Sequence, residues 1–61
     1  MFKYQREFIK FVNEKLGYKA FRRDDFVEFL FCVPQEDKKG FYDEFCAVKG
    51  WTEKDLEQKL F

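Results

Sequence analysis

The chain has 61 residues, of which 46% are hydrophobic and 39% charged, and its twelve Lys and Arg side chains balance twelve Asp and Glu side chains. This composition is typical of a folded protein, and the length suits one small domain over residues 1–61. The sequence contains no histidine and no serine, which excludes serine hydrolase triads, histidine acid–base catalysis and histidine-ligated metal sites within this chain. We therefore expect a protein that is not an enzyme and that binds no cofactor and no metal.

Residues 3–16 are predicted to form an amphipathic helix. At about 100° per residue, one half of the helical wheel carries the apolar residues Tyr4, Phe8, Ile9, Phe11, Val12 and Leu16. Gly17 is expected to end this helix, and residues 18–23 to form a connector.

The apolar run over residues 26–33 is consistent with two structures. Asp25 with Glu28 resembles a capping box and favours a helix. That helix would bring together Phe26, Phe29, Leu30 and Val33. A strand is the alternative, because Phe and Val favour strands, although it would have no partner strand. Pro34 ends the element in either case.

A third helix is expected over residues 38–49, after a turn formed by the charged segment QEDKK. Asp37 would be its N-cap, and Gly50 would end it. Its apolar side would carry Phe41, Tyr42, Phe45 and Val48.

The last helix, over about residues 53–60, has the clearest local signals. Thr52 is placed to cap it together with Asp55, and Trp51 and Leu56 have the spacing of a hydrophobic staple. The sequence as a whole therefore predicts an all-α fold, a compact bundle of about four short helices.

Aromatic residues dominate the apolar part of the sequence, with ten Phe, three Tyr and one Trp. A domain of this size buries only about 60% of its unfolded surface, and each buried ring removes about 150–250 Å² from water. We therefore expect an aromatic-rich core in place of disulfides or a metal. Cys32 and Cys46 lie within apolar runs, which predicts two small, buried, reduced thiols; a single disulfide is the alternative.

The last two predicted helices resemble the helix–turn–helix family over about 20 residues, FYDEFCAVKGWTEKDLEQKL. A small residue, Cys46, precedes the turn glycine Gly50 by four positions, and Leu56 follows it by six. The resemblance implies a helical hairpin whose second helix would read DNA. Against two lysines, however, this second helix carries the acidic residues Glu53, Asp55 and Glu57. An acidic helix does not suit a polyanion, so a hairpin that only completes the core is the competing interpretation of residues 38–60.

The balanced charge conceals two unlike halves. Residues 1–23 carry seven basic and two acidic side chains, a net charge of +5, whereas residues 24–61 carry five basic and ten acidic, a net charge of −5. Lys3, Arg6 and Lys10 would form a basic patch on the first helix, which either binds phosphates or pairs with the acidic half. The acidic half would in turn suit an inhibitor that mimics nucleic acid.

The number of aromatic rings exceeds what so small a domain easily buries, and exposed apolar patches usually mark interfaces. We expect Phe21, Arg22, Arg23, Phe31 and Trp51 to contact a partner, since aromatic and Arg side chains often anchor interfaces. The predicted function is a non-enzymatic protein-interaction module, a small inhibitor or adaptor of the kind that phages and mobile elements encode, which binds a larger protein. A homodimer and a small nucleic-acid-binding regulator are the alternatives. With no apolar stretch of about 20 residues and no signal peptide, we expect no membrane association and a cytoplasmic location.

Overall fold

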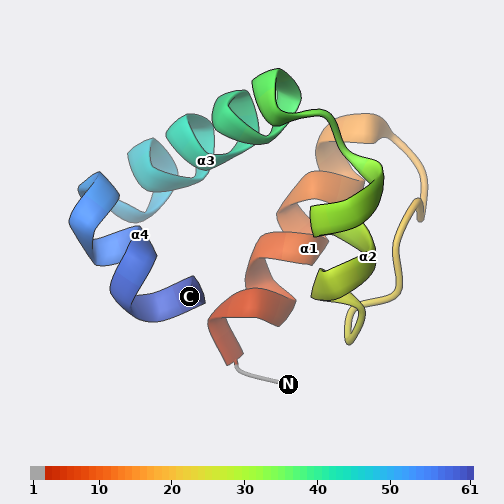
Figure 1. Cartoon of the computed structure of the whole chain (residues 1–61), viewed down its shortest axis with the longest axis horizontal. Helices are drawn as coiled ribbons and strands as arrows, with labels where there is room; N and C mark the ends of the chain where they lie inside the picture. The colour runs from red at the N-terminus through yellow and green to blue at the C-terminus, as the bar shows by residue number, and fades with distance from the viewer. Residues whose placement is uncertain (1–2) are drawn as a thin grey trace.

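Four helices make up the secondary structure of residues 3–61, the part of the chain that the computed structural model describes (Figure 1). They are α1 (Lys3–Leu16), α2 (Phe26–Cys32), α3 (Gln35–Lys49) and α4 (Glu53–Leu60). α1 packs against each of the other three helices, and α3 also packs against α4. Figure 1 shows α2 and α4 on opposite sides of α1, with α3 crossing at the top. The predicted all-α bundle is confirmed.

The core contains mainly aromatic side chains, as the composition predicts. Its buried members are Phe8, Ile9, Val12, Phe26, Phe29, Phe45, Cys46, Leu56 and Leu60. Phe8 lies at the centre, where its ring centroid is 5.1 Å from those of Phe29 and Phe45, nearly perpendicular to both. Edge-to-face contacts of this kind add to the free energy gained by burying the rings.

The predicted bounds of α1 are correct. Its apolar face is buried at Phe8, Ile9 and Val12. Gly17 ends the helix with a left-handed φ of 82°, a conformation that glycine adopts without steric cost, and its N–H donates to the carbonyl of Asn13.

Residues 26–32 are a helix, so the strand alternative is excluded. Asp25 caps α2 by accepting a hydrogen bond from the backbone N–H of Glu28 at 2.9 Å. The reciprocal bond of a capping box is not formed, since the N–H of Asp25 donates to the carbonyl of Arg22. Val33 is extended before Pro34, as expected, and α2 ends there.

The predicted start of α3 is wrong by three residues. The helix begins at Gln35, directly after Pro34, because Pro34 has the extended conformation of an N-cap and its carbonyl accepts the N–H of Lys38 at 2.9 Å. Asp37 therefore lies in the first turn and not at the N-cap, where its charge still favours the positive end of the helix dipole.

Two predictions of burial are also wrong. Val48 is exposed, because the buried face of α3 runs through Phe45 and Cys46 towards α4. Cys32 is exposed as well, because it lies off the face of α2 that packs on the core through Phe26, Phe29 and Leu30. Both cysteines are free thiols, so the disulfide alternative is excluded.

The turn and the helix cap of the hairpin formed by α3 and α4 are as predicted. Gly50 ends α3 in the left-handed region, with a φ of 71°. Thr52 and Asp55 form both bonds of the capping box, at 3.3 Å and 3.0 Å. The ring of Trp51 packs edge-on against Tyr4 and Phe45, at 5.3 Å and 5.5 Å between centroids.

The two ends of the described chain meet at the same side of the bundle. Gln5 donates a hydrogen bond from Nε2 to the carbonyl of Leu60 at 2.8 Å, and Lys59 places its ammonium 4.7 Å from the centre of the Tyr4 ring. Among residues 3–61, no helix has the length and apolar character needed to cross a membrane.

Candidate binding groove

An open groove of about 770 Å³ lies between the connector that follows α1 and the first half of α3. In Figure 1 these two segments meet at the upper right. The uncharged lining residues are Leu16, Tyr18, Ala20, Phe21, Cys32, Val33, Pro34, Gly40 and Phe41. Tyr18 is 66% exposed and Leu16 is 41% exposed, while Phe21 and Phe41 are half-buried at the edge of the core. The floor of the groove is therefore an apolar surface that the described part of the chain leaves uncovered.

All the charged residues that line the groove are acidic. They are Glu36, Asp37, Asp43 and Glu44, and they lie along α3 on either side of Gly40 and Phe41. We call these four residues the acidic rim. Positions three, four and seven apart share one face of a helix, so the rim is a stripe and not a scatter of charges.

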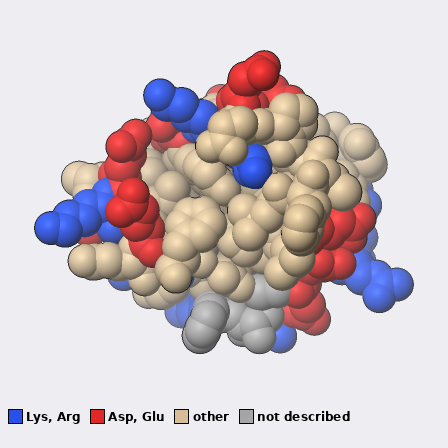
Figure 2. All heavy atoms as spheres, in the orientation of Figure 1, with Lys and Arg blue, Asp and Glu red and all other residues tan. Residues whose placement is uncertain are grey.

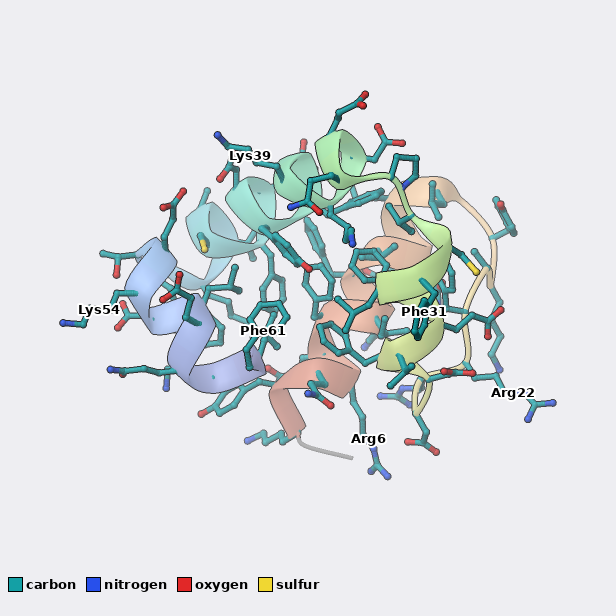
Figure 3. The ribbon with its side chains drawn as sticks, in the orientation of Figure 1. Arg6, Arg22, Phe31, Lys39, Lys54 and Phe61 are labelled. Atoms are coloured by element: carbon teal, nitrogen blue, oxygen red, sulfur yellow. The ribbon has the colours of Figure 1, made fainter. Side chains whose placement is uncertain are left out.

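The lysines of α3 do not neutralise this stripe. Lys38 reaches across to α2, where its Nζ donates to the carbonyl of Leu30 at 2.9 Å. Lys39 lines a smaller hollow beside α4, and Figure 3 shows its side chain pointing away from the bundle. Lys15 of α1 does reach the rim, where its Nζ lies 3.4 Å from the carboxylate of Glu44. Both side chains are about half exposed, so the pair contributes little to stability, but it matches the charge at one end of the stripe.

Asn13 fixes one wall of the groove to α1. Its Nδ2 donates to the carbonyl of Phe21 at 2.9 Å, and the N–H of Phe21 donates to its Oδ1 at 3.1 Å. The ring of Phe21 in turn packs against Phe29, 5.7 Å between centroids. Sequence reasoning missed Asn13, because its position on the helical wheel placed it among the solvent-exposed polar residues.

Gly40 is a glycine that the fold itself does not require. It lies inside α3, its φ is not positive, and a Cβ built on it would meet no atom within 4 Å. Glycine in a helix interior costs about 0.5–1 kcal/mol relative to alanine. The missing side chain keeps the groove open at its middle, between the carboxylates of the acidic rim.

The residues predicted to contact a partner are not brought together. Phe21 lines the groove. Arg22 and Arg23 are exposed on the connector outside it, and Figure 3 shows Arg22 extending away from the bundle. Phe31 is 84% exposed on α2 but does not line the groove. Trp51 is half-buried in its contacts with α1 and α3.

The predicted basic patch is exposed but is partly neutralised. Lys3, Arg6 and Lys10 are all exposed on α1. Arg6 forms an ion pair with Asp24, with 2.8 Å between Nε and the carboxylate, so one of the three charges is matched by the acidic half of the chain. In α4, Lys59 covers the rings of Tyr4 and Trp51, which leaves the remaining charges of that helix mainly acidic.

A largely uncharged area lies on the face shown in Figure 2, with both acidic and basic side chains at its edges. Phe31 and Phe61 both lie on this face (Figure 3), and Phe61 is 64% exposed. The ring of Phe61 nevertheless packs against Phe26 and Tyr42, 5.7 Å and 5.8 Å between centroids. It therefore covers the core on one side while its other side faces the solvent.

The groups with shifted pKa values lie outside the groove. Burial raises the pKa of the Tyr42 hydroxyl, and burial together with nearby carboxylates raises the pKa of the Cys46 thiol. The Cys46 thiol donates a hydrogen bond to the carbonyl of Thr52, with 3.8 Å between sulfur and oxygen, so its contact lies within the hairpin of α3 and α4. Within residues 3–61, no group of three or more His, Cys, Asp or Glu side chains is arranged to hold a metal ion.

The sequence matches no protein-family model, and comparisons with curated proteins and with solved structures gave no match either.

Proposed function

We propose that this protein is a non-enzymatic protein-interaction module, a small inhibitor or adaptor that binds a larger protein through the groove. The observation that carries the proposal is the exposure of Tyr18 and Leu16 beside a core that is already closed without them. Contiguous apolar surface of this kind usually marks an interface. The free thiols of Cys32 and Cys46 suit a reducing compartment, so we place this function in the cytoplasm.

A nucleic-acid-binding regulator is the second candidate function. Lys3 and Lys10 support it, because both remain exposed on α1. The ion pair between Arg6 and Asp24 and the acidic residues of α4 weigh against it, since each lowers the positive potential that phosphates require.

Affinity capture with matched variants separates these candidates. Tagged wild-type protein, Gly40→Trp and Gln58→Trp would be incubated with lysate of the source cells, with and without nuclease, and the bound material identified by mass spectrometry. Gly40→Trp fills the groove, whereas Gln58→Trp adds the same side chain to an exposed position on α4 outside it.

We expect a stoichiometric protein that survives nuclease, binds the wild type and Gln58→Trp equally, and is lost from Gly40→Trp. Material that disappears with nuclease and binds all three forms equally would instead support nucleic-acid binding. A protein captured equally by all three forms would refute the groove as the binding surface.

A further inference from the structure

We infer that the groove binds a basic amphipathic α-helix of the partner protein, with apolar side chains on the groove floor and Lys or Arg side chains against the acidic rim. This inference rests on the proposed function and specifies the chemistry of the partner. Three features of the groove support it: its charge, its length and the position of Gly40.

The charge of the groove is one-sided. Four carboxylates line it, and no lysine or arginine does. Of the nearest basic residues on α3, Lys38 donates to the carbonyl of Leu30, and Lys39 lines a separate hollow beside α4 that it shares with Asp43. An incoming cation would meet the carboxylates of Glu36, Asp37 and Asp43, whereas Glu44 at the far end of the rim already has Lys15 3.4 Å away. Complementary charge of this kind selects the partner and speeds its association.

The length of the acidic rim fits a short helix. From Glu36 to Glu44 the axis of α3 rises about 12 Å, at 1.5 Å per residue. Apolar anchors at positions i, i+3, i+4 and i+7 of a bound helix span about the same length, which is the usual mode of recognition in a hydrophobic groove. One helix of two to three turns would therefore contact the whole rim.

Gly40 lies midway along this rim and gives the closest approach to α3. Small residues on a helix surface allow a second helix to pack near its backbone. Among residues 3–61, nothing occupies the space beside Gly40, since a Cβ there would meet no atom within 4 Å. Gly40 lowers the stability of α3, and its presence is explained if the backbone of a bound helix passes beside it.

A second copy of the chain does not supply such a helix from the residues that the structure describes. α1 is the basic amphipathic helix of this protein, but its apolar face at Phe8, Ile9 and Val12 is fully buried in its own core. The occupant is therefore expected to come from a different protein.

The test is selection from a phage-displayed library of random 16-residue peptides on the immobilised wild-type protein at physiological salt. Enriched peptides would be synthesised, and their affinities measured by fluorescence anisotropy. We expect peptides of net positive charge with apolar residues at helical spacing. Gly40→Trp should weaken their binding at least tenfold, and Gln58→Trp less than twofold.

Neutral variants test the rim. The double variant Glu36→Gln/Asp43→Asn should weaken binding at least threefold and reduce its dependence on salt. The matched double variant Glu53→Gln/Glu57→Gln, which removes two charges from α4, should change the affinity less than twofold. If circular dichroism shows that Gly40→Trp is unfolded, Tyr18→Ala serves in its place, with an expected loss of at least threefold.

The remaining outcomes overturn the inference in distinguishable ways. If the enriched peptides are acidic or neutral but still bind Gly40→Trp more weakly than the wild type, the inference that the partner helix is basic is refuted, while the proposed function stands. Failure to enrich any peptide sensitive to Gly40→Trp would refute binding of a helix in the groove, while the affinity capture with the same variants decides the proposed function separately. A concentration-dependent dimer in analytical ultracentrifugation that Gly40→Trp abolishes would identify a second copy as the occupant and refute the inference.

Discussion

The two hydrogen bonds between Asn13 and Phe21 lead to a quantitative prediction for Asn13→Ala. The substitution removes both bonds and leaves the N–H and the carbonyl of Phe21 without their side-chain partner in a half-buried position. Each bond contributes about 0.5–1.5 kcal/mol, and an unpaired buried group costs about 1–3 kcal/mol. Because the site is only partly buried, we expect a loss of about 2 kcal/mol in the free energy of unfolding. A chain of 61 residues has about 3–9 kcal/mol in total, so the effect is large.

Urea denaturation followed by circular dichroism measures this loss directly. At about 4–8 °C per kcal/mol, Tm should fall by about 8–16 °C. Asn13→Asp is the sharper variant: it keeps the acceptor for the N–H of Phe21 but replaces the donor with an oxygen that faces the carbonyl of Phe21, so we expect at least the same loss. Glu14→Ala, an exposed neighbour on the same helix, is the control and should stay within about 0.5 kcal/mol.

A result within about 0.5 kcal/mol of the wild type for Asn13→Ala would refute this reasoning. It would show that packing of the Phe21 ring on Phe29 holds the connector without the hydrogen bonds. If the prediction holds, Asn13→Ala should also weaken binding of the selected peptides while the protein is still folded, because one wall of the groove is then free to move.

Three further predictions concern reactivity, pH and helix stability. A thiol reagent should label Cys32 rapidly and Cys46 only on the timescale of unfolding, because Cys32 is exposed while burial and nearby carboxylates raise the pKa of Cys46; equal rates would contradict the structure. The pKa of the Glu28 carboxyl is raised above 4.5, first by a hydrogen bond between this carboxyl and the Asp25 side chain, then by desolvation and by the charge of Asp25. Glu28 therefore contributes stability at low pH, and this contribution is lost as the pH rises through the folded-state pKa. Glu28→Gln should therefore gain stability relative to the wild type between pH 4 and pH 7 in urea titrations, and a constant difference would contradict this sign. Gly40→Ala should stabilise the protein by about 0.5–1 kcal/mol in the same assay while weakening peptide binding, and destabilisation would show that the groove is less open than the structure indicates.

The helix boundaries that the sequence predicts correctly depend on residues close to one another in the chain. Gly17 ends α1 and Thr52 begins α4 through bonds within a single turn, so local patterns are sufficient there. The start of α3 was misplaced because charged residues resemble a turn, whereas Pro34 in an extended conformation already acts as the cap. Pro34 is the local signal for the start of this helix, but the charged composition of the residues after it favoured a turn.

The groove could not be predicted in the same way, because its walls come from segments that only the tertiary fold brings together. The sequence places Glu36 in a charged turn and Asp37 at a helix N-cap, and Tyr18 lies in a connector without periodicity. The exposure of a side chain also depends on neighbours that are distant in sequence. Trp51 and Phe31 were both expected to contact a partner, yet Trp51 packs against Tyr4 whereas Phe31 is 84% exposed.

Trp51 is the one tryptophan of the chain, and its position makes it an intrinsic fluorophore for tertiary structure. Its indole touches Tyr4 of α1 and Phe45 of α3, and the ammonium of Lys59 lies 5.2 Å from the ring. Emission from this indole therefore reports whether the start of α1 is docked on the hairpin. Because Trp51 does not line the groove, a peptide bound there should leave the emission spectrum in place while unfolding shifts it to the red. Occupancy and folding can then be followed independently in one unlabelled sample.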